Sequence, residues 1–385
     1  MRTHQWRRKF LLTLFATLSI VISTPLLAND QFEQALYALV SDSDMVGMAA
    51  AVVRDGNVSF METWGVRELG STAEITPDTR FRIASLSKGF AATLTAKLIE
   101  RDKLSIKDPI TFFNQDFRLK DGASTAAVTV EDVLSHRVSL PPYAYDNLLE
   151  AGKQPPEILR KMNQVKPVCD VSECYAYQNV AFNMITSVIE SVGSQSYSEL
   201  VASELFEPLG MNSASFGSAG LQIEDDWARS YSRSKNGPWK TRSVKEAYYN
   251  VPAAGGVNAS LLDMTKWLAA HLGYAPEVIS DQALELIQTP VVKTAREMWR
   301  YRRMKNLSNA HYGLGWRLYE YADTLVVNHS GSVEGYSAQI AFLPEQNVGM
   351  VILTNSRTRE FWDILQLFLD AELGLENPKL TNPDE

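Results

Sequence analysis

Segments with strand character occur at both ends of this chain and enclose a long stretch with helical periodicity. Near the start, residues 48–53 and 58–64 flank the turn signal Asp55-Gly56, a pattern typical of a β-hairpin. Late in the chain, strands are expected at residues 313–319, 324–328, 336–343 and 348–354. We therefore predict one antiparallel sheet built from both ends of the chain.

The middle of the chain is predicted to be mainly helical. Residues 85–98 carry Phe90, Leu94 and Leu98 at every fourth position, as on one face of a helix. Further helices are expected at residues 179–191, from the capping box at Ser260 to Gly273, and at 361–373.

These patterns predict an α/β (α+β) fold. The sheet is expected from about residues 45–65 and 312–355, flanked by helices, with a mainly helical lobe inserted over about residues 85–300. Together they form one domain over residues 29–375, followed by a polar tail at 376–385. A cleft between sheet and lobe is the expected place for chemistry.

The first 28 residues are predicted to be a secretory signal peptide. Four basic residues within the first nine precede a mostly apolar run at residues 10–23, and a small residue, Ala28, marks the expected cleavage point. The alternative is a retained membrane anchor, but the run is shorter than the roughly 20 residues that a span requires. The expected location is therefore periplasmic or secreted, without a stable membrane span after cleavage.

The charge of the chain excludes one class of partner. Cleavage would remove four positive charges and no acid, so the formal net charge of −8 would become −12. A chain this acidic lacks the positive footprint that nucleic-acid binding requires. We therefore expect a small-molecule or peptide substrate and no nucleic-acid partner, while oligomeric state is left open.

Cys169 and Cys174 are the two cysteines of the chain. In an exported protein, two close cysteines predict a disulfide. A metal site is the rival interpretation, but the histidines show no HxH or HExxH spacing that would supply further ligands. We predict the disulfide and no metal.

Ser85-Leu86-Ser87-Lys88 is the strongest chemical signal in the sequence. A serine and a lysine three residues apart on a helix lie on the same face, so an amine kept neutral by burial could deprotonate the hydroxyl. The positive end of the helix would favour both the neutral amine and a developing oxyanion. Taken alone, the motif also fits a capping serine followed by a solvated lysine. Ser87 has no such lysine partner.

Two later motifs add complementary groups. Tyr177 and Asn179 stand two residues apart before a predicted helix, where a phenol could relay protons and an amide could hold substrate or Lys88. His329-Ser330-Gly331-Ser332 lies in a strand-rich stretch. Its glycine permits close approach of a ligand, and the Ser332 N–H could form an oxyanion hole with the Ser85 N–H.

The order SxxK, YxN and H-S-G resembles the signature of class C beta-lactamases, D-alanyl-D-alanine carboxypeptidases and related esterases. Family-like stretches also lie at residues 82–85, 129–136, 205–211, 254–257, 312–316 and 335–355. The resemblance implies a serine hydrolase without a cofactor. It assigns Ser85 as nucleophile, Lys88 as base, Tyr177 as proton shuttle, Asn179 as a substrate contact and His329 as support for Tyr177 and the leaving group.

Two departures from the family pattern affect the expected substrate. Class C lactamases usually begin the third motif with lysine, whereas His329 resembles the carboxypeptidase and esterase branches. Arg137-Val138-Ser139 replaces the usual Thr-Ser-Gly, so the following loop is expected to have another shape. Arg317 resembles an arginine that holds a terminal carboxylate in some carboxypeptidases, although an exposed strand arginine is the alternative.

A D-alanyl-D-alanine carboxypeptidase-like enzyme is the resulting functional hypothesis. A beta-lactamase, a small-ester hydrolase and a non-catalytic wall-binding protein are the alternatives. The basic stretch Lys293–Lys305 is either a solvated surface or a rim that attracts an anionic substrate.

Overall fold

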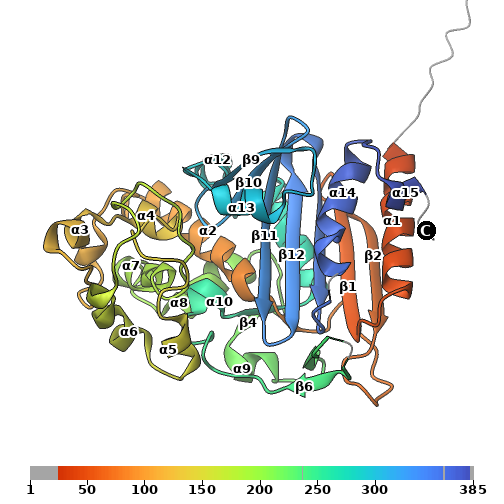
Figure 1. Cartoon of the computed structure of the whole chain (residues 1–385), viewed down its shortest axis with the longest axis horizontal. Helices are drawn as coiled ribbons and strands as arrows, with labels where there is room; N and C mark the ends of the chain where they lie inside the picture. Colours follow the sequence, from red (N-terminus) through yellow and green to blue (C-terminus); the bar gives the residue numbers. More distant parts are fainter. Residues whose placement is uncertain (1–24, 236, 359, 382–385) are drawn as a thin grey trace, which may run out of the picture.

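The computed structural model describes residues 25–235, 237–358 and 360–381. Within these residues the fold is organised around an eight-stranded antiparallel sheet with strand order β2-β1-β13-β12-β11-β10-β9-β8 (Figure 1). Its strands are β1 (Gly47–Arg54), β2 (Asn57–Gly65), β8 (Val292–Lys293), β9 (Leu307–Tyr312), β10 (Arg317–Tyr321), β11 (Thr324–Val333), β12 (Tyr336–Leu343) and β13 (Val348–Thr354). Ala51 pairs with Val351, so the predicted sheet from both ends of the chain is confirmed.

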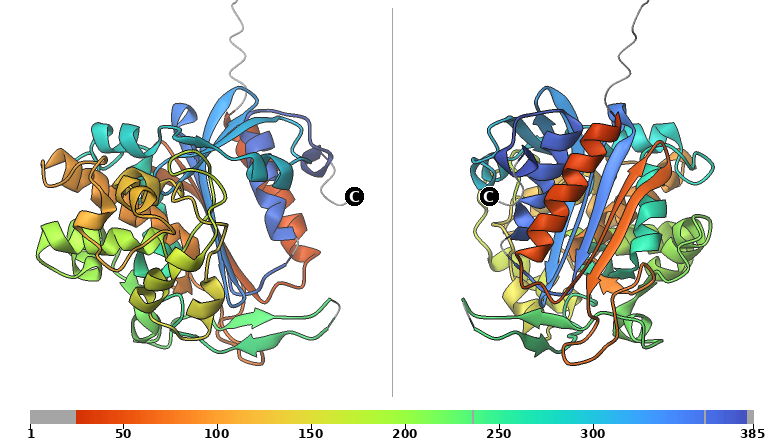
Figure 2. Two further views of the ribbon diagram at one scale, coloured as in Figure 1. Left: turned by 60° about the vertical axis from the view of Figure 1, so that its left-hand side comes forward. Right: turned by 90° about the vertical axis from the view of Figure 1, so that its right-hand side faces the viewer.

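Helices cover both faces of this sheet. In β1, Ala49, Ala51 and Val53 face one core, while the alternate residues face a second core. On the first side lie α2 (Ser87–Glu100) and α11 (Leu261–His271); on the second lie α1 (Pro25–Ser41) and α14 (Ile364–Glu372), seen in front of the sheet in the right-hand view of Figure 2. Double coverage explains why the central strands are continuously apolar rather than alternating.

The inserted lobe projects from the first face of the sheet (Figure 1). Its helices are α3 (Gly122–Ala127), α4 (Val130–Leu134), α5 (Asp146–Glu150), α6 (Pro155–Lys161), α7 (Ile185–Gly193), α8 (Tyr197–Val201), α9 (Gly217–Leu221), α10 (Pro252–Gly255) and α12 (Asp281–Ile287). In contrast, α13 (Ala295–Arg300) packs against the second core through Met298. Short strands β3 (Phe81–Arg82), β7 (Val257–Ala259) and β4 (Ser215–Phe216) form a small sheet, and β5 (Ser230–Ser232) pairs with β6 (Lys240–Arg242). The predicted capping box is present, because the Ser260 hydroxyl accepts a hydrogen bond from the Asp263 N–H.

The sheet starts earlier than the sequence pattern indicated. β8 and β9 precede the expected boundary at residue 312, and the predicted strand at 313–319 is β10, shifted to Arg317–Tyr321. β9 has an irregular burial pattern and pairs with β10 across a register shift at Glu320 and Tyr321. Such a strand depends on its neighbour rather than on its own apolar alternation, so its sequence carries a weak signal.

Both ends of the domain also differ in detail from the expectation. Residues 1–24 of the predicted signal peptide lie outside the described residues, and residues 25–28 open α1, a helix that the sequence analysis did not predict. The expected helix at 361–373 is a 3₁₀ turn followed by α14, and the expected polar tail contains α15 (Pro378–Thr381) with Leu380 buried. Within the described residues, no helix has the length and apolar character needed to cross a bilayer.

The predicted disulfide between Cys169 and Cys174 is confirmed. It lies in the segment that leads to Tyr177, and the Ser139 hydroxyl donates a 2.5 Å hydrogen bond to the Cys169 carbonyl. The disulfide therefore closes a six-residue loop, and the hydrogen bond from Ser139 connects this loop to the segment after α4.

Replacing both cysteines with serine should lower the free energy of unfolding by about 2 kcal/mol, the loop-entropy value for six residues. Urea denaturation of the oxidised protein and the double variant measures this difference. Reduced wild type is the matched control and should unfold at the same urea concentration as the variant. An unchanged midpoint in both would show that the disulfide does not constrain the unfolded chain.

Candidate active site

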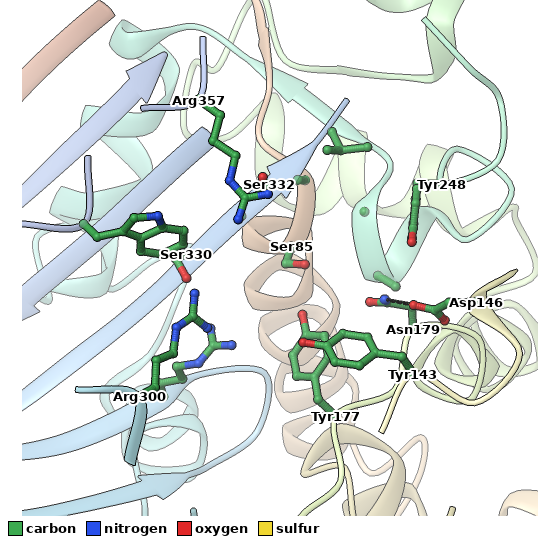
Figure 3. A pocket seen from close by; sticks show the side chains of 17 residues that line it. Ser85, Tyr143, Asp146, Tyr177, Asn179, Tyr248, Arg300, Ser330, Ser332 and Arg357 are labelled. Carbon is green, nitrogen blue, oxygen red and sulfur yellow. Dashed lines mark hydrogen bonds between the residues drawn. The ribbon is translucent and has the colours of Figure 1, made fainter. Parts of the chain in front are cut away.

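A cavity of about 220 Å³ lies where α2, β11 and the inserted lobe meet. Figure 3 shows Ser85 at its centre, with Tyr177 below it and Ser330 and Ser332 to one side. The predicted site residues that line this cavity are Ser85, Tyr177, Asn179, Arg317, Ser330, Gly331 and Ser332. Lys88 is fully buried and bonded to Asn179 beside the cavity, while His329 lies behind its wall.

Ser85 occupies a 3₁₀ turn at the start of α2 rather than the helix itself. The first hydrogen bond of the turn runs from the Leu86 N–H to the Ile83 carbonyl, so the Ser85 N–H precedes the bonded part of the turn. Ala84 has a φ of +49°, a left-handed conformation that is rare for a non-glycine residue. The backbone therefore turns sharply just before Ser85.

Ser87 has a structural role in this turn. Its hydroxyl donates to the Ala84 carbonyl at 2.6 Å and accepts from the Val257 N–H at 3.0 Å. These bonds fix the turn against β7 and hold the Ser87 hydroxyl away from the cavity.

Lys88 is placed to act on Ser85. Its Nζ lies 3.5 Å from Ser85 Oγ and donates to Asn179 Oδ1 at 2.9 Å and to the Ala254 carbonyl at 2.8 Å. Burial, opposed by the charge of Asp146 and reinforced by that of Arg317, lowers the pKa of Lys88 well below its ordinary value. The solvated lysine that the motif alone would also allow is therefore wrong.

Asp146 is a site residue that the sequence analysis missed. Its Oδ2 accepts a 2.7 Å hydrogen bond from Asn179 Nδ2, and its Oδ1 is buried without a hydrogen-bond partner among the described residues. The resulting chain of contacts links Asp146 to Lys88 through Asn179. An acid in the first turn of α5 looks like ordinary helix capping, so no local pattern connects Asp146 with Lys88.

Tyr177 lines the cavity beside the nucleophile Ser85. Burial raises the pKa of its hydroxyl well above the ordinary value for a phenol, and the Ser85 side chain opposes this rise. Lys88 Nζ lies 4.7 Å from the centroid of the Tyr177 ring. The His136 ring packs against the Tyr177 ring, with 4.4 Å between the two centroids. The phenol is therefore protonated and fixed in direction, as a proton relay requires.

Gly331 brings β11 unusually close to the turn that carries Ser85. A Cβ atom at Gly331 would lie 2.3 Å from the Ile83 carbonyl oxygen and 2.9 Å from the Ser85 nitrogen. The pairing of β10 with β11 ends at Arg317 and Asn328, so residues 330–333 border the cavity on this side while they pair with β12 on the other. This arrangement permits two N–H groups, of Ser85 and Ser332, to face one oxyanion.

His329 lies beside Tyr177, with 6.3 Å between the ring centroids, but its hydrogen bonds go to other residues. Within the described part of the chain, its ring hydrogen-bonds Tyr312 and Arg317, and its Nδ1 lies 3.0 Å from the Ser330 carbonyl. Burial, with the nearby charges of Arg317 and Lys88, lowers the pKa of His329 well below its ordinary value. Support of Tyr177 by His329 would therefore be indirect, and it stays a prediction.

Arg317 lies in the wall of the cavity, with 5% of its surface exposed. The alternative of an exposed strand arginine is therefore wrong. Its Nε lies 3.4 Å from Glu297 Oε2, and Glu297 is buried and also accepts a 3.0 Å hydrogen bond from the Tyr319 hydroxyl. The acid inside the basic stretch thus compensates the buried guanidinium.

The cavity has opposite charge on its two sides. Arg300 and Arg357 lie near Ser330 and Ser332, whereas Asp146 and Tyr248 lie on the other side of Ser85 (Figure 3). Neither Arg357 nor Tyr248 was predicted as a site residue, and Arg300 was predicted only as part of the basic stretch. Nothing in the sequence shows that these segments meet.

The beta-lactamase family model matches residues 30–372. The chain therefore belongs to the beta-lactamase family, a class of serine hydrolases that includes penicillin-binding proteins. This finding agrees with the fold and with the residues gathered around Ser85.

Individual proteins show how far the similarity extends. The chain is 25% identical to an unguisins hydrolase, ungD, of Aspergillus violaceofuscus over 92% of the chain and 66% of that protein. It is 22% identical to protein flp of Staphylococcus aureus strain COL over 86% of the chain and 64% of that protein. The chain thus spans slightly less than two thirds of the length of these relatives.

A solved structure has the same fold. The octameric penicillin-binding protein homologue from Pyrococcus abyssi superposes with a TM-score of 0.80 and 26% identity, covering 91% of this chain and 78% of that chain. The sheet and inserted lobe are therefore an arrangement that this family adopts.

Asp146→Asn should shift the acidic limb of the pH profile of kcat/KM to lower pH. The Asp146 carboxylate raises the pKa of Lys88, so its removal lowers that pKa, and the neutral amine then exists at lower pH. Asp323→Asn, an exposed residue of the β10–β11 turn, is the matched control and should leave the limb in place. A shift toward higher pH would contradict the assignment of Lys88 as base.

Gly331→Ala should lower kcat by on the order of a hundredfold, as expected for losing one oxyanion donor. The added Cβ collides with backbone atoms at Ile83 and Ser85, so the two N–H groups must move apart. Gly122→Ala is the control, because a Cβ there meets nothing within 4 Å. Unchanged kcat in the Gly331 variant would exclude an oxyanion hole between these segments.

Proposed function

We propose that this chain is an exported serine hydrolase that works through an acyl-enzyme on Ser85 and acts as a D-alanyl-D-alanine carboxypeptidase-like enzyme. The observation that carries the proposal is the buried Lys88 amine, 3.5 Å from Ser85 Oγ and bonded to two carbonyl oxygens. A neutral amine in this position supplies the base that serine needs for nucleophilic attack.

Acylation begins with attack of Ser85 Oγ on the substrate carbonyl. The hydroxyl proton passes to Lys88 Nζ, directly or through the Tyr177 hydroxyl in the same cavity. The carbonyl oxygen becomes an oxyanion, held by the N–H groups of Ser85 and Ser332. Tyr177 then protonates the leaving amine as the carbon–nitrogen bond breaks, and it regains a proton from Lys88, which becomes neutral again.

Deacylation uses the same groups in reverse. Water replaces the leaving group, gives its proton to the Tyr177 and Lys88 pair, and attacks the acyl carbonyl. The carbon–oxygen bond to Ser85 breaks, and Oγ regains its proton. The acyl product leaves as a carboxylic acid.

The charge of the cavity supports a substrate with a carboxylate near the scissile bond. Arg300, Arg317 and Arg357 line the same cavity as Ser85, and guanidinium groups bind carboxylates through charge-assisted hydrogen bonds. A terminal D-alanine carries such a group. A beta-lactam carries one as well, so the chemistry of the acyl-enzyme must separate the two activities.

A small-ester hydrolase is the second candidate. The neutral, buried His329 occupies the position where lactamases usually have lysine. An imidazole behind the cavity wall adds no positive charge for a carboxylate. The neutral His329 therefore favours ester substrates, whose binding does not require a positive charge in the third motif.

A fluorescent penicillin followed by intact-mass analysis tests the proposed mechanism. A lasting adduct on Ser85 is expected for a penicillin-binding peptidase, and Ser85→Ala should abolish both adduct and hydrolysis. Rapid loss of the adduct with ring-opened product would indicate a lactamase, and ester turnover without an adduct would indicate an esterase. Hydrolysis that survives Ser85→Ala would overturn the mechanism.

Ser87→Ala is the matched control for this experiment. The variant should still carry the adduct on Ser85, since Ser87 is not the nucleophile. Its thermal midpoint should fall because the hydroxyl bonds to Ala84 and Val257 are lost.

A further inference from the structure

A second, larger cavity of about 610 Å³ adjoins the cavity around Ser85. The two cavities share Arg300, Arg357 and Trp362 in their walls. The remaining lining residues of the second cavity are Tyr301, Arg302, Arg303, Met304, Asp363 and Gln366. One elongated molecule can therefore occupy both cavities at once.

The second cavity carries an excess of positive charge. Four arginines line it, and the one acid, Asp363, already forms a 2.8 Å ion pair with Lys379. The guanidinium of Arg300 lies 4.6 Å from the Trp362 ring centroid and that of Arg302 lies 4.6 Å from the Trp299 ring centroid. Among the residues whose side chains the structure describes, which exclude residue 360, no acid forms an ion pair with any of these four arginines.

Arg317 shows the contrasting case. That guanidinium is buried and faces the buried carboxylate of Glu297 at 3.4 Å. In the second cavity, Arg300 lies over the Trp362 ring, and Arg302 lies over the Trp299 ring and donates to the Trp299 carbonyl, so the charge of both is left for a ligand. Guanidinium groups prefer carboxylates, which they bind with two parallel hydrogen bonds.

The floor of the second cavity differs from its rim. Tyr301 and Met304 are both buried, whereas Arg302 and Arg303 are exposed. A ligand that fits has an apolar backbone or linker against this floor and anionic groups at its edge. A peptide with carboxylate side chains has this combination.

We propose that this second cavity, the arginine cavity, binds the acyl-side extension of an elongated substrate, the part that precedes the carbonyl attacked by Ser85 and carries carboxylate groups. The proposal rests on the proposed function, because it places the scissile carbonyl at Ser85. It also assigns a role to the basic stretch Lys293–Lys305, whose Arg300, Arg302 and Arg303 form part of the cavity wall.

Two substrates with the same D-alanine leaving group test the proposal. One carries a neutral glutamine-containing extension on the acyl side of the scissile bond, and the other a glutamate-containing extension of equal length. The variant R302E/R303E changes two residues that line the arginine cavity but not the cavity around Ser85. K240E/R242E in the exposed β6 makes the same charge change on residues that line neither cavity.

We expect R302E/R303E to lower kcat/KM for the glutamate substrate roughly tenfold at low salt, the lower end of electrostatic enhancement in charged clefts. The glutamine substrate should change less than twofold, and K240E/R242E should affect the two substrates equally. The effect should shrink at 1 M salt, where the Debye length falls to about 3 Å. Equal losses on both substrates, or no loss on either, would overturn the proposal.

A binding measurement separates failure of this inference from failure of the proposed function. Calorimetry with Ser85→Ala and the intact glutamate peptide requires no turnover. Binding that R302E/R303E weakens supports the arginine cavity even if Ser85 proves not to be the nucleophile. If R302E/R303E leaves the binding affinity unchanged while hydrolysis still requires Ser85, the proposed role of the arginine cavity is wrong and the proposed function stands.

Discussion

The rest of the site depends on keeping the Lys88 amine out of water. An isolated ammonium in such a place is costly, and here two carbonyl oxygens, of Asn179 and Ala254, receive its hydrogen bonds. Those acceptors hold the neutral amine in place without a directly bonded counterion, while Asp146 acts at one remove through Asn179. Burial therefore makes the Lys88 amine a base, and the inserted lobe contributes to that burial through Asn179 and Ala254.

The sheet supplies the opposite wall of the site. β11 can approach the turn at Ser85 because Gly331 has no side chain, and a single methyl group there would collide with backbone atoms. The strand is itself held by β12, which pairs with β13 and so with β1 from the other end of the chain. The close approach at Gly331 thus depends on the position of the whole sheet. A shift of any central strand would widen the distance between the N–H groups of Ser85 and Ser332.

The fold was predictable from the sequence wherever the apolar residues recur with a clear period. The site was predictable where several residue types occur together in a combination that is rare by chance. The hairpin at Gly56, the capping box at Ser260 and the disulfide followed from local patterns that tertiary contacts only had to preserve. β9 and α1 were missed, because β9 is stabilised by its neighbour and α1 begins within residues predicted to be a signal peptide. Asp146 was missed because its partner Asn179 is 33 residues away, and no local pattern joins them.

Chemistry and substrate choice are carried by different kinds of residue in this molecule. Lys88 and Tyr177 are buried, so their properties depend on the fold and tolerate little change. Arg300 and Arg357 are exposed at the rim, where a substitution alters the charge presented to substrate without disturbing the core. Proteins that share one buried base can therefore act on different substrates when the residues at the rim of the cavity differ. The motifs that identify the chemistry consequently carry the least information about which substrate is bound.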